Sequence, residues 1–202
     1  MLVRTRWMLT IVAAVAGACT ADKNARSSGD TLTPSQPPAT PAADSTTTPA
    51  SATPTSAWTL TPSGIGPIRV GMTVEDLKRV GGDVNVPSGN ADCAYVRPPS
   101  APAGVSVMLA HGEVTRIDVE SSGVQSDAGI VVGDSASRVS QVYAGRVTTT
   151  PHKYVQGGQY LTVRSTSPQD SAFRIVFEIE AGRVTRFRSG RLPEVAWVER
   201  CG

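Results

Sequence analysis

Apolar side chains recur at two spacings along residues 58–202, first that of a helix and then that of strands, and this order occurs twice. Thr73 and Ser135 stand where the two helical stretches begin, and a hydroxyl side chain there can cap the first turn. Glycine commonly follows the last turn of a helix, so we expect the helices to end at residues 81–82 and 144–145. The apolar residues at helical spacing are Val74 and Leu77 in the first stretch and Ala136, Val139 and Val142 in the second.

The strand pattern is clearest in the second half, where apolar and polar residues alternate on both sides of a turn predicted at residues 180–182. On the returning strand, residues 183–189, Phe187 is expected on the apolar face. The apolar positions before the turn are Phe173, Ile175, Phe177 and Ile179. The polar face of the returning strand is expected to hold Val184, Arg186 and Arg188.

A weaker alternation predicts a hairpin in the first half, with its turn at His111 and Gly112. The imidazole of His111 is expected to be exposed and to have no functional role. One apolar and one polar face per hairpin is typical of a sheet that helices cover on one side and water covers on the other. The apolar face is expected to hold Val105, Val107, Leu109, Thr115, Ile117 and Val119. The polar face is expected to hold Arg116, Asp118 and Glu120.

The two halves share two short signatures. Residues 68–73 (IRVGMT) correspond to residues 130–135 (IVVGDS), and Gly112-Glu-Val-Thr-Arg-Ile corresponds to Gly182-Arg-Val-Thr-Arg-Phe. We therefore predict an α+β fold in which two tandem helix-plus-antiparallel-meander repeats, about 58–124 and 125–202, form one globular domain.

The second pair of signatures is separated by more residues than the first, so the second half carries an insertion. We expect an extra loop within residues 148–171, and loops on a rigid scaffold commonly carry binding residues. Aromatic and polar side chains gather there: His152, Lys153, Tyr154 and Tyr160. These four are candidate binding residues, with the alternative that Tyr154 and Tyr160 are packing residues at a strand edge beside a Gly-Gly turn.

Arg186 and Arg188 are further candidates for contact with an acidic partner. The more ordinary interpretation is a solvated strand face on which these arginines pair with Glu178 and Glu180.

The first residues have the layout of a secretory signal: Arg4 and Arg6 precede residues 7–18, which are apolar apart from Thr10. This stretch is shorter than the about 20 apolar residues that span a membrane, which disfavours a permanent helical anchor. Residues 16–19 (AGAC) resemble the lipobox of bacterial lipoproteins, in which the cysteine is lipidated. The lipobox usually has Leu where this chain has Ala16, so lipoprotein-type cleavage before Cys19 and ordinary cleavage both remain open.

Residues 19–57 are rich in Thr, Ser, Pro and Ala and contain Leu32 as the only large apolar side chain. Such a segment buries too little apolar surface to offset the entropy of ordering, so we expect a disordered tether. A plain spacer is favoured over a glycosylated stalk.

Behind a signal segment, the helix start Gly-Met-Thr or Gly-Asp-Ser with a following antiparallel meander resembles the β-lactamase inhibitor protein fold and the small outer-membrane assembly lipoproteins of the SmpA/OmlA type. The resemblance covers about residues 66–189. Those families act by binding other proteins and carry no catalytic residues, so only the helix start at 71–73, a structural feature, carries over. Residues 151–154 (PHKY) and 199–201 (ERC) also look like features of uncharacterised bacterial envelope proteins.

Three cysteines, an odd number, need an explanation in an exported chain. Lipidation of Cys19 would leave Cys93 and Cys201 to form one disulfide in an oxidising compartment, with two unpaired buried thiols as the alternative.

The full chain carries a net charge of +2, and removal of Arg4 and Arg6 from its 19 basic residues leaves 17, equal to its 17 acidic residues. A neutral exported protein is not expected to bind nucleic acid.

Sequence motifs of common catalytic and metal sites are absent, including G-x-S-x-G, the phosphate-binding loop, H-E-x-x-H and C-x-x-C. We expect no catalytic residue, metal or other cofactor. The predicted function is therefore a non-enzymatic, membrane-tethered envelope lipoprotein that binds an envelope protein, with its domain facing the periplasm or the cell exterior. An inhibitor of a secreted enzyme is the alternative, and a hydrolase is a third class.

Overall fold

The computed structural model describes residues 58–87 and 92–201. The signal segment, the lipidation of Cys19 and the tether, all predicted for residues 1–57, lie outside these ranges. Within the described ranges, no helix has the length and apolar character needed to cross a membrane.

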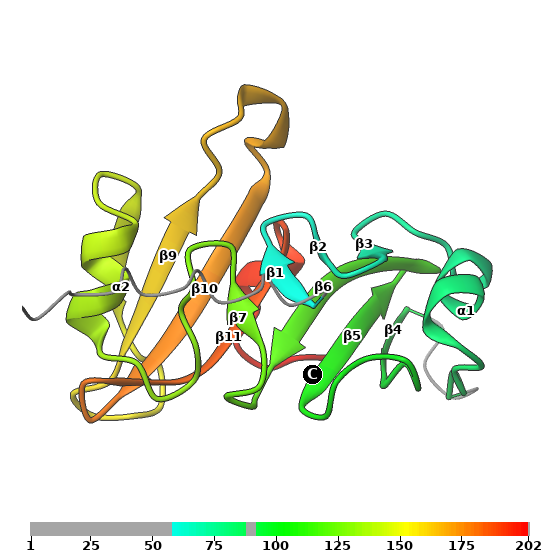
Figure 1. The fold of residues 1–202 in the computed structure, drawn as a ribbon, viewed down its shortest axis with the longest axis horizontal. Coiled ribbons are helices and arrows are strands. Elements are labelled where there is room, and N and C mark those ends of the chain that lie inside the picture. The colour runs from blue at the N-terminus through cyan, green and yellow to red at the C-terminus, as the bar shows by residue number, and fades with distance from the viewer. Residues whose placement is uncertain (1–57, 88–91, 202) are drawn as a thin grey trace, which may run out of the picture. The chain divides into compact units, whose positions relative to one another are not determined.

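The larger of two sheets has seven antiparallel strands in the order β4-β5-β6-β11-β10-β9-β8 (Figure 1). Its centre is the pairing of β6 with β11, which joins the two predicted hairpins, β5–β6 and β10–β11, into one sheet. The strands are β4 (Cys93–Val96), β5 (Val105–Ala110), β6 (Glu113–Val119), β8 (Val147–Pro151), β9 (Gln159–Arg164), β10 (Phe173–Glu180) and β11 (Arg183–Arg191).

The smaller sheet has the order β3-β2-β1-β7 and was not predicted, because strands of two or three residues are too short to show an alternation. Its apolar residues Leu60, Ile65 and Ile68 belong to the main core. The strands are β1 (Thr59–Thr61), β2 (Gly64–Ile65), β3 (Ile68–Arg69) and β7 (Gln125–Ser126).

Both helices begin at the predicted caps. Helix α1 (Val74–Gly81) starts after Thr73, whose hydroxyl accepts a hydrogen bond from the Asp76 amide at 3.1 Å, and it ends at Gly82, which has a φ of 88°. Helix α2 (Ala136–Val142) starts after Ser135, which caps the Arg138 amide at 3.2 Å.

The apolar side of α2 differs from the prediction at its end. Val142 is 41 % exposed, whereas Tyr143 is buried. Tyr143 lies four residues after the buried Val139 and therefore on the same side of the helix. Its ring packs 5.7 Å from that of Phe177, centroid to centroid, so the tyrosine fills the space assigned to the valine.

The two helices and the small sheet cover one face of the large sheet, which we call the helix face. The start of each helix is joined to its hairpin by two backbone hydrogen bonds of 2.7–2.8 Å. Gly71 donates to Val114 while Val114 donates to Met72. At the corresponding positions, Gly133 donates to Val184 and Val184 donates to Asp134. The structure is mostly β-sheet with two short helices, which confirms the α+β class.

Val184 was predicted on the polar face, and this is wrong. The pairing of β10 with β11 shifts register after Glu178, so that Val184 lies opposite Ile179 and both are buried in the main core. The extra residue of this bulge is Thr185, whose hydroxyl donates to the Glu178 carbonyl at 3.3 Å. Single-residue bulges leave no clear mark in an apolar pattern.

The extra loop expected within residues 148–171 is mostly a hairpin. Strands β8 and β9 occupy much of this segment and are paired from Val147 to Val163. The Thr-rich stretch of β8 and the aromatic and branched residues of β9 favour strands, a propensity that outweighs the polar composition. Irregular backbone remains at residues 152–158 and at residues 165–172, which contain the short helix η1 (Pro168–Asp170).

Candidate functional site

The last residues of the chain cross the face of the large sheet opposite the helices. We call residues 192–201, with their short helix η2 (Glu194–Ala196), the C-terminal segment, and the face they cross the C-terminal face. Helix η2 lies against β6, β10 and β11, and in Figure 1 the segment is the red chain that passes behind these strands. The prediction that water covers this face is wrong here, because the C-terminal segment covers it.

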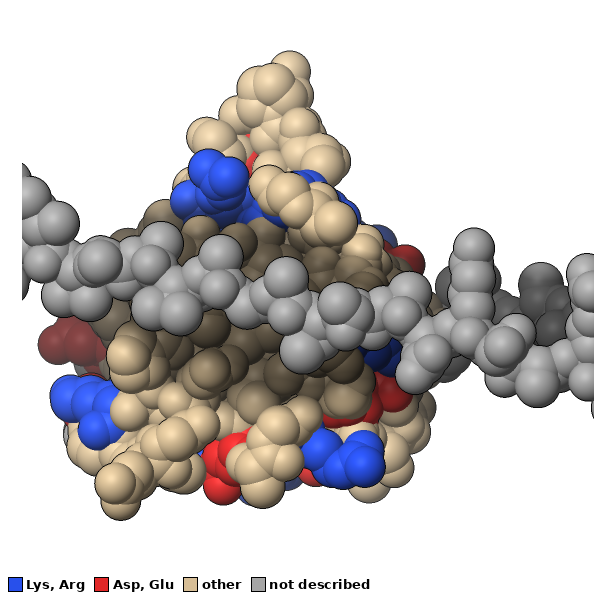
Figure 2. Space-filling model, turned by 90° about the vertical axis from the view of Figure 1, so that its left-hand side faces the viewer, with Lys and Arg blue, Asp and Glu red and all other residues tan. Residues whose placement is uncertain are grey.

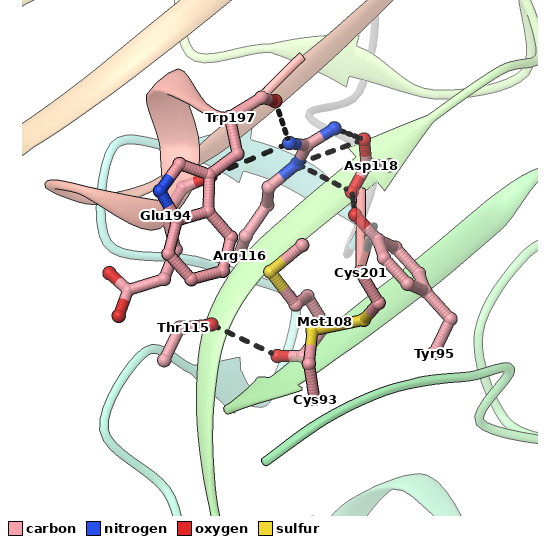
Figure 3. The surroundings of a disulfide bond; sticks show 9 residues. All are labelled: Cys93, Tyr95, Met108, Thr115, Arg116, Asp118, Glu194, Trp197 and Cys201. Atoms are coloured by element: carbon pink, nitrogen blue, oxygen red, sulfur yellow. Dashed lines mark hydrogen bonds and ion pairs between the residues drawn. A yellow bond between two sulfur atoms is a disulfide. The ribbon is translucent and has the colours of Figure 1, made fainter. Parts of the chain in front are cut away.

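A disulfide bond between Cys93 and Cys201 confirms the predicted pairing, with the two Cα atoms 5.5 Å apart (Figure 3). Cys93 is the first residue of the edge strand β4, and Cys201 ends the C-terminal segment. The bond therefore fixes the far end of the segment to the edge of the sheet.

Beside the disulfide, Arg116 connects the sheet to the C-terminal segment (Figure 3). Its guanidinium donates to both carboxylate oxygens of Asp118 at 2.5–3.1 Å and to the carbonyl of Trp197 at 2.6 Å. The Tyr95 hydroxyl donates to Asp118 at 3.0 Å, and burial together with the Asp118 charge raises the pKa of this hydroxyl. Arg116 and Asp118 are both 2 % exposed, so this ion pair is screened from water.

A second buried cluster surrounds Glu178. Arg188, 2 % exposed, donates one bond to the Glu178 carboxylate and another, of 2.7 Å, to the carbonyl of Val195 in the C-terminal segment. Arg186 lies 2.8 Å from the other oxygen of Glu178. Burial lowers the pKa of Arg188, although an arginine stays protonated under the conditions in which proteins fold. Glu178 is the predicted partner of these arginines, but the solvated face predicted for Arg188 is wrong.

His152 and Tyr160 complete this cluster. The two rings stack with centroids 4.4 Å apart. The Nδ1 atom of His152 accepts the backbone amides of Tyr154 and Val155 at 3.1 Å each, while its Nε2 atom lies 3.5 Å from a Glu178 oxygen. His152 therefore shapes the loop between β8 and β9, and Tyr160 is packed as the strand-edge alternative expects.

Lys153 and Tyr154 lie at the surface, above the C-terminal segment. Both side chains bond the carboxylate of Glu199, and the Lys153 ammonium lies 5.2 Å from the centroid of the Tyr154 ring. These bonds, first that of Lys153 and then that of Tyr154, hold the pKa of Glu199 below its ordinary value. The bond to Glu199 holds the ring of Tyr154 in place. Because Tyr154 is still 63 % exposed, the ring is available to a partner.

A cleft of about 340 Å³ opens next to Lys153, between the C-terminal segment and the edge of the sheet. Exposed Leu192 stands at the cleft, and Trp197 is exposed farther along the same segment. Neither residue was predicted from the sequence. The signal that could have found them is the run of apolar residues in the last stretch of the chain. The apolar residues that line the cleft are Pro151, Tyr160, Val176, Leu192, Val195, Ala196 and Val198.

The fold is distantly similar to a solved structure. No family model and no curated protein matches the sequence. The crystal structure of the uncharacterized protein YfeY from Escherichia coli is similar to this chain with a TM-score of 0.42 and 10 % sequence identity. The similarity covers 66 % of this chain and 99 % of that one.

All six candidate binding residues lie on the C-terminal face, where four surround Glu178 and two bond Glu199. Two of the buried carboxylates, those of Asp118 and Glu178, form ion pairs with arginines. Residues 58–87 and 92–201 contain no group of three or more His, Cys, Asp or Glu side chains that could hold a metal ion. What these contacts do is hold the C-terminal segment on the sheet and present Lys153 and Tyr154 above it.

Proposed function

We propose that the protein is a non-enzymatic, membrane-tethered envelope lipoprotein that binds another protein through its C-terminal face. The observation that carries the proposal is Tyr154, which is exposed but fixed by Glu199. Its neighbour Lys153 lines the apolar cleft at Leu192. Tyrosine is enriched in protein interfaces, and a ring that is already fixed loses little entropy on binding.

The tandem organisation is part of this proposal. The same two backbone hydrogen bonds join each helix start to its hairpin, at Gly71 and at Gly133, which supports two copies of one helix-plus-meander unit. This supports the resemblance to the inhibitor and assembly-lipoprotein families, which act through protein binding. In this chain the C-terminal segment would add the binding surface, since it follows the hairpin of the second unit.

Export is the second part of the proposal. The Cys93–Cys201 disulfide supports an oxidising compartment, where such bonds persist. The pairing leaves Cys19 as the one cysteine available for lipidation.

Truncation of Tyr154 tests the binding surface. The full-length protein is used to capture its partner from envelope extract. Tyr154→Ala should weaken the binding free energy for that partner by about 2 kcal/mol or more, as truncation of an aromatic anchor does. The melting temperature of the Tyr154→Ala variant should equal that of the native protein, because Tyr154 is 63 % exposed. Tyr154→Phe, which keeps the ring and loses the bond to Glu199, should weaken capture less.

Val142→Ala on α2 is the control, since Val142 is also an exposed large apolar residue but lies outside the C-terminal face. It should leave both capture and melting unchanged. Equal capture by the Tyr154→Ala and Val142→Ala variants would remove Tyr154 from the interface.

Substitution of Cys19 tests the membrane attachment. Cys19→Ala should move the protein from the membrane fraction to the soluble fraction, because the acyl group would have no attachment site. Fractionation of cells that produce each form measures this. A variant that stays in membranes with an uncleaved N-terminus would show that the anchor is a helix and not a lipid.

A further inference from the structure

Three arginines, Arg146, Arg164 and Arg174, lie together at the end of the sheet where β8 and β10 begin and β9 ends. Arg164 lies directly opposite Arg174 in the pairing of these strands, and the Arg164 amide donates to the Arg146 carbonyl at 3.1 Å. Like charges directly opposite one another in a sheet are destabilising unless something neutralises them.

Within the described residues, no carboxylate forms an ion pair with any of these three arginines. Other arginines of the domain have one: Arg79 faces Asp76 and Arg116 faces Asp118. Asp170 belongs to the adjoining loop but does not line the space between the three arginines. The guanidinium of Arg174 donates instead to the carbonyls of Ser171 and Phe173 at 2.6 and 2.7 Å. A guanidinium has five N–H donors, so others have no acceptor among the described residues.

The three arginines line a cleft of about 470 Å³ at the base of the loop 165–172. Figure 2 shows basic side chains gathered beneath the projection at the top of the molecule, and this projection is the loop between β9 and β10 in Figure 1. The hydroxyl residues on the wall of the cleft are Ser165, Thr166, Ser167 and Ser171.

We propose that this cleft binds a phosphate group. Guanidinium groups bind phosphate oxygens through paired N–H donors, and hydroxyl groups can donate to the remaining oxygens. A bound phosphate would also neutralise the facing charges of Arg164 and Arg174. The ligand chemistry is shared by free phosphate and by the phosphate ester of a lipid headgroup.

Titration calorimetry of the full-length protein with inorganic phosphate and with glycerol 3-phosphate, at constant ionic strength, tests the site. Saturable binding of either is expected, and Arg164→Gln and Arg174→Gln should each weaken it at least tenfold. Tighter binding of glycerol 3-phosphate assigns the site to a phosphate ester, whereas equal or tighter binding of inorganic phosphate assigns it to the free ion. Acetate should bind far more weakly than either.

Arg183→Gln is the control, because Arg183 also has no carboxylate partner among residues 58–87 and 92–201 and donates to the Gly133 carbonyl, away from the cleft. It should leave phosphate binding unchanged. The Arg164→Gln variant should melt no lower than the native protein without phosphate, since it removes one of two facing like charges. Absence of saturable phosphate binding, equal binding of acetate, or equal loss in the Arg183→Gln variant would overturn the proposal.

Discussion

Glu178→Gln should lower the free energy of unfolding by about 3 to 5 kcal/mol, the range seen when one partner of a buried ion pair is removed. The substitution keeps the size of the side chain but leaves the guanidinium of Arg188 buried without the carboxylate that pairs with it. It also weakens the contact with Arg186. Urea denaturation of the full-length protein measures the change.

Glu180→Gln is the matched control, two residues farther along β10. Glu180 forms no ion pair with an arginine in the described residues, and its loss should change stability by less than about 1 kcal/mol. The double variant Glu178→Gln/Arg188→Met should recover part of the loss, since it no longer buries an unpaired charge at residue 188. Equal effects of Glu178→Gln and Glu180→Gln would show that the buried pair does not hold this face together.

Removal of the disulfide should have an effect of similar size. The bond joins residues 108 positions apart, and closing a loop of this length is expected to stabilise the folded state by about 4 to 5 kcal/mol. Cys93→Ser and Cys201→Ser should each lose about this amount, and the double variant should lose no more, because all three lack the same cross-link. Urea denaturation with and without a reductant measures these losses.

The reductant supplies the internal check. It should bring the native protein to the stability of the variants and leave the variants unchanged. Cys19→Ser should behave as the native protein in both conditions, since Cys19 takes no part in the bond. A native protein that the reductant does not destabilise would contradict the predicted contribution of the cross-link.

The local elements of the fold were predictable because each depends on neighbouring residues. Thr73 and Ser135 identify the helix starts through their own hydroxyl groups, and the turn at His111 and Gly112 follows from the alternation on both sides of it. The strand register of the hairpins was harder to predict from the sequence. A bulge such as that at Thr185 moves Val184 to the other face without any change in composition.

The cover over the C-terminal face depends on contacts between distant parts of the chain. The position of Arg188 on a polar strand face is readable from the alternation, but its burial depends on residues such as Val195 that follow it and fold back over it. The predicted pairing of Cys93 with Cys201 contained part of this information, since it required the end of the chain to return to the sheet. Which strands the segment crosses could not be read from the sequence.

In the candidate site, too, local features could be predicted from the sequence and contacts between distant residues could not. The sequence identified Tyr154 from its type and its place beside a glycine turn, but the position of its ring depends on the bond to Glu199, a residue far along the chain. The arginine cleft was missed because Arg146, Arg164 and Arg174 are well separated in sequence and meet only through the pairing of β9 with its neighbours.

Photo-crosslinking in the cells that naturally make the protein tests most directly whether the C-terminal face contacts another protein. A photoreactive amino acid would replace Leu192, at the apolar cleft, or Val142, on α2, since both side chains are 41 % exposed. We predict a light-dependent adduct with another protein from residue 192 and none from residue 142. The same adducts from both positions, or no protein adduct from residue 192, would contradict the proposed binding surface.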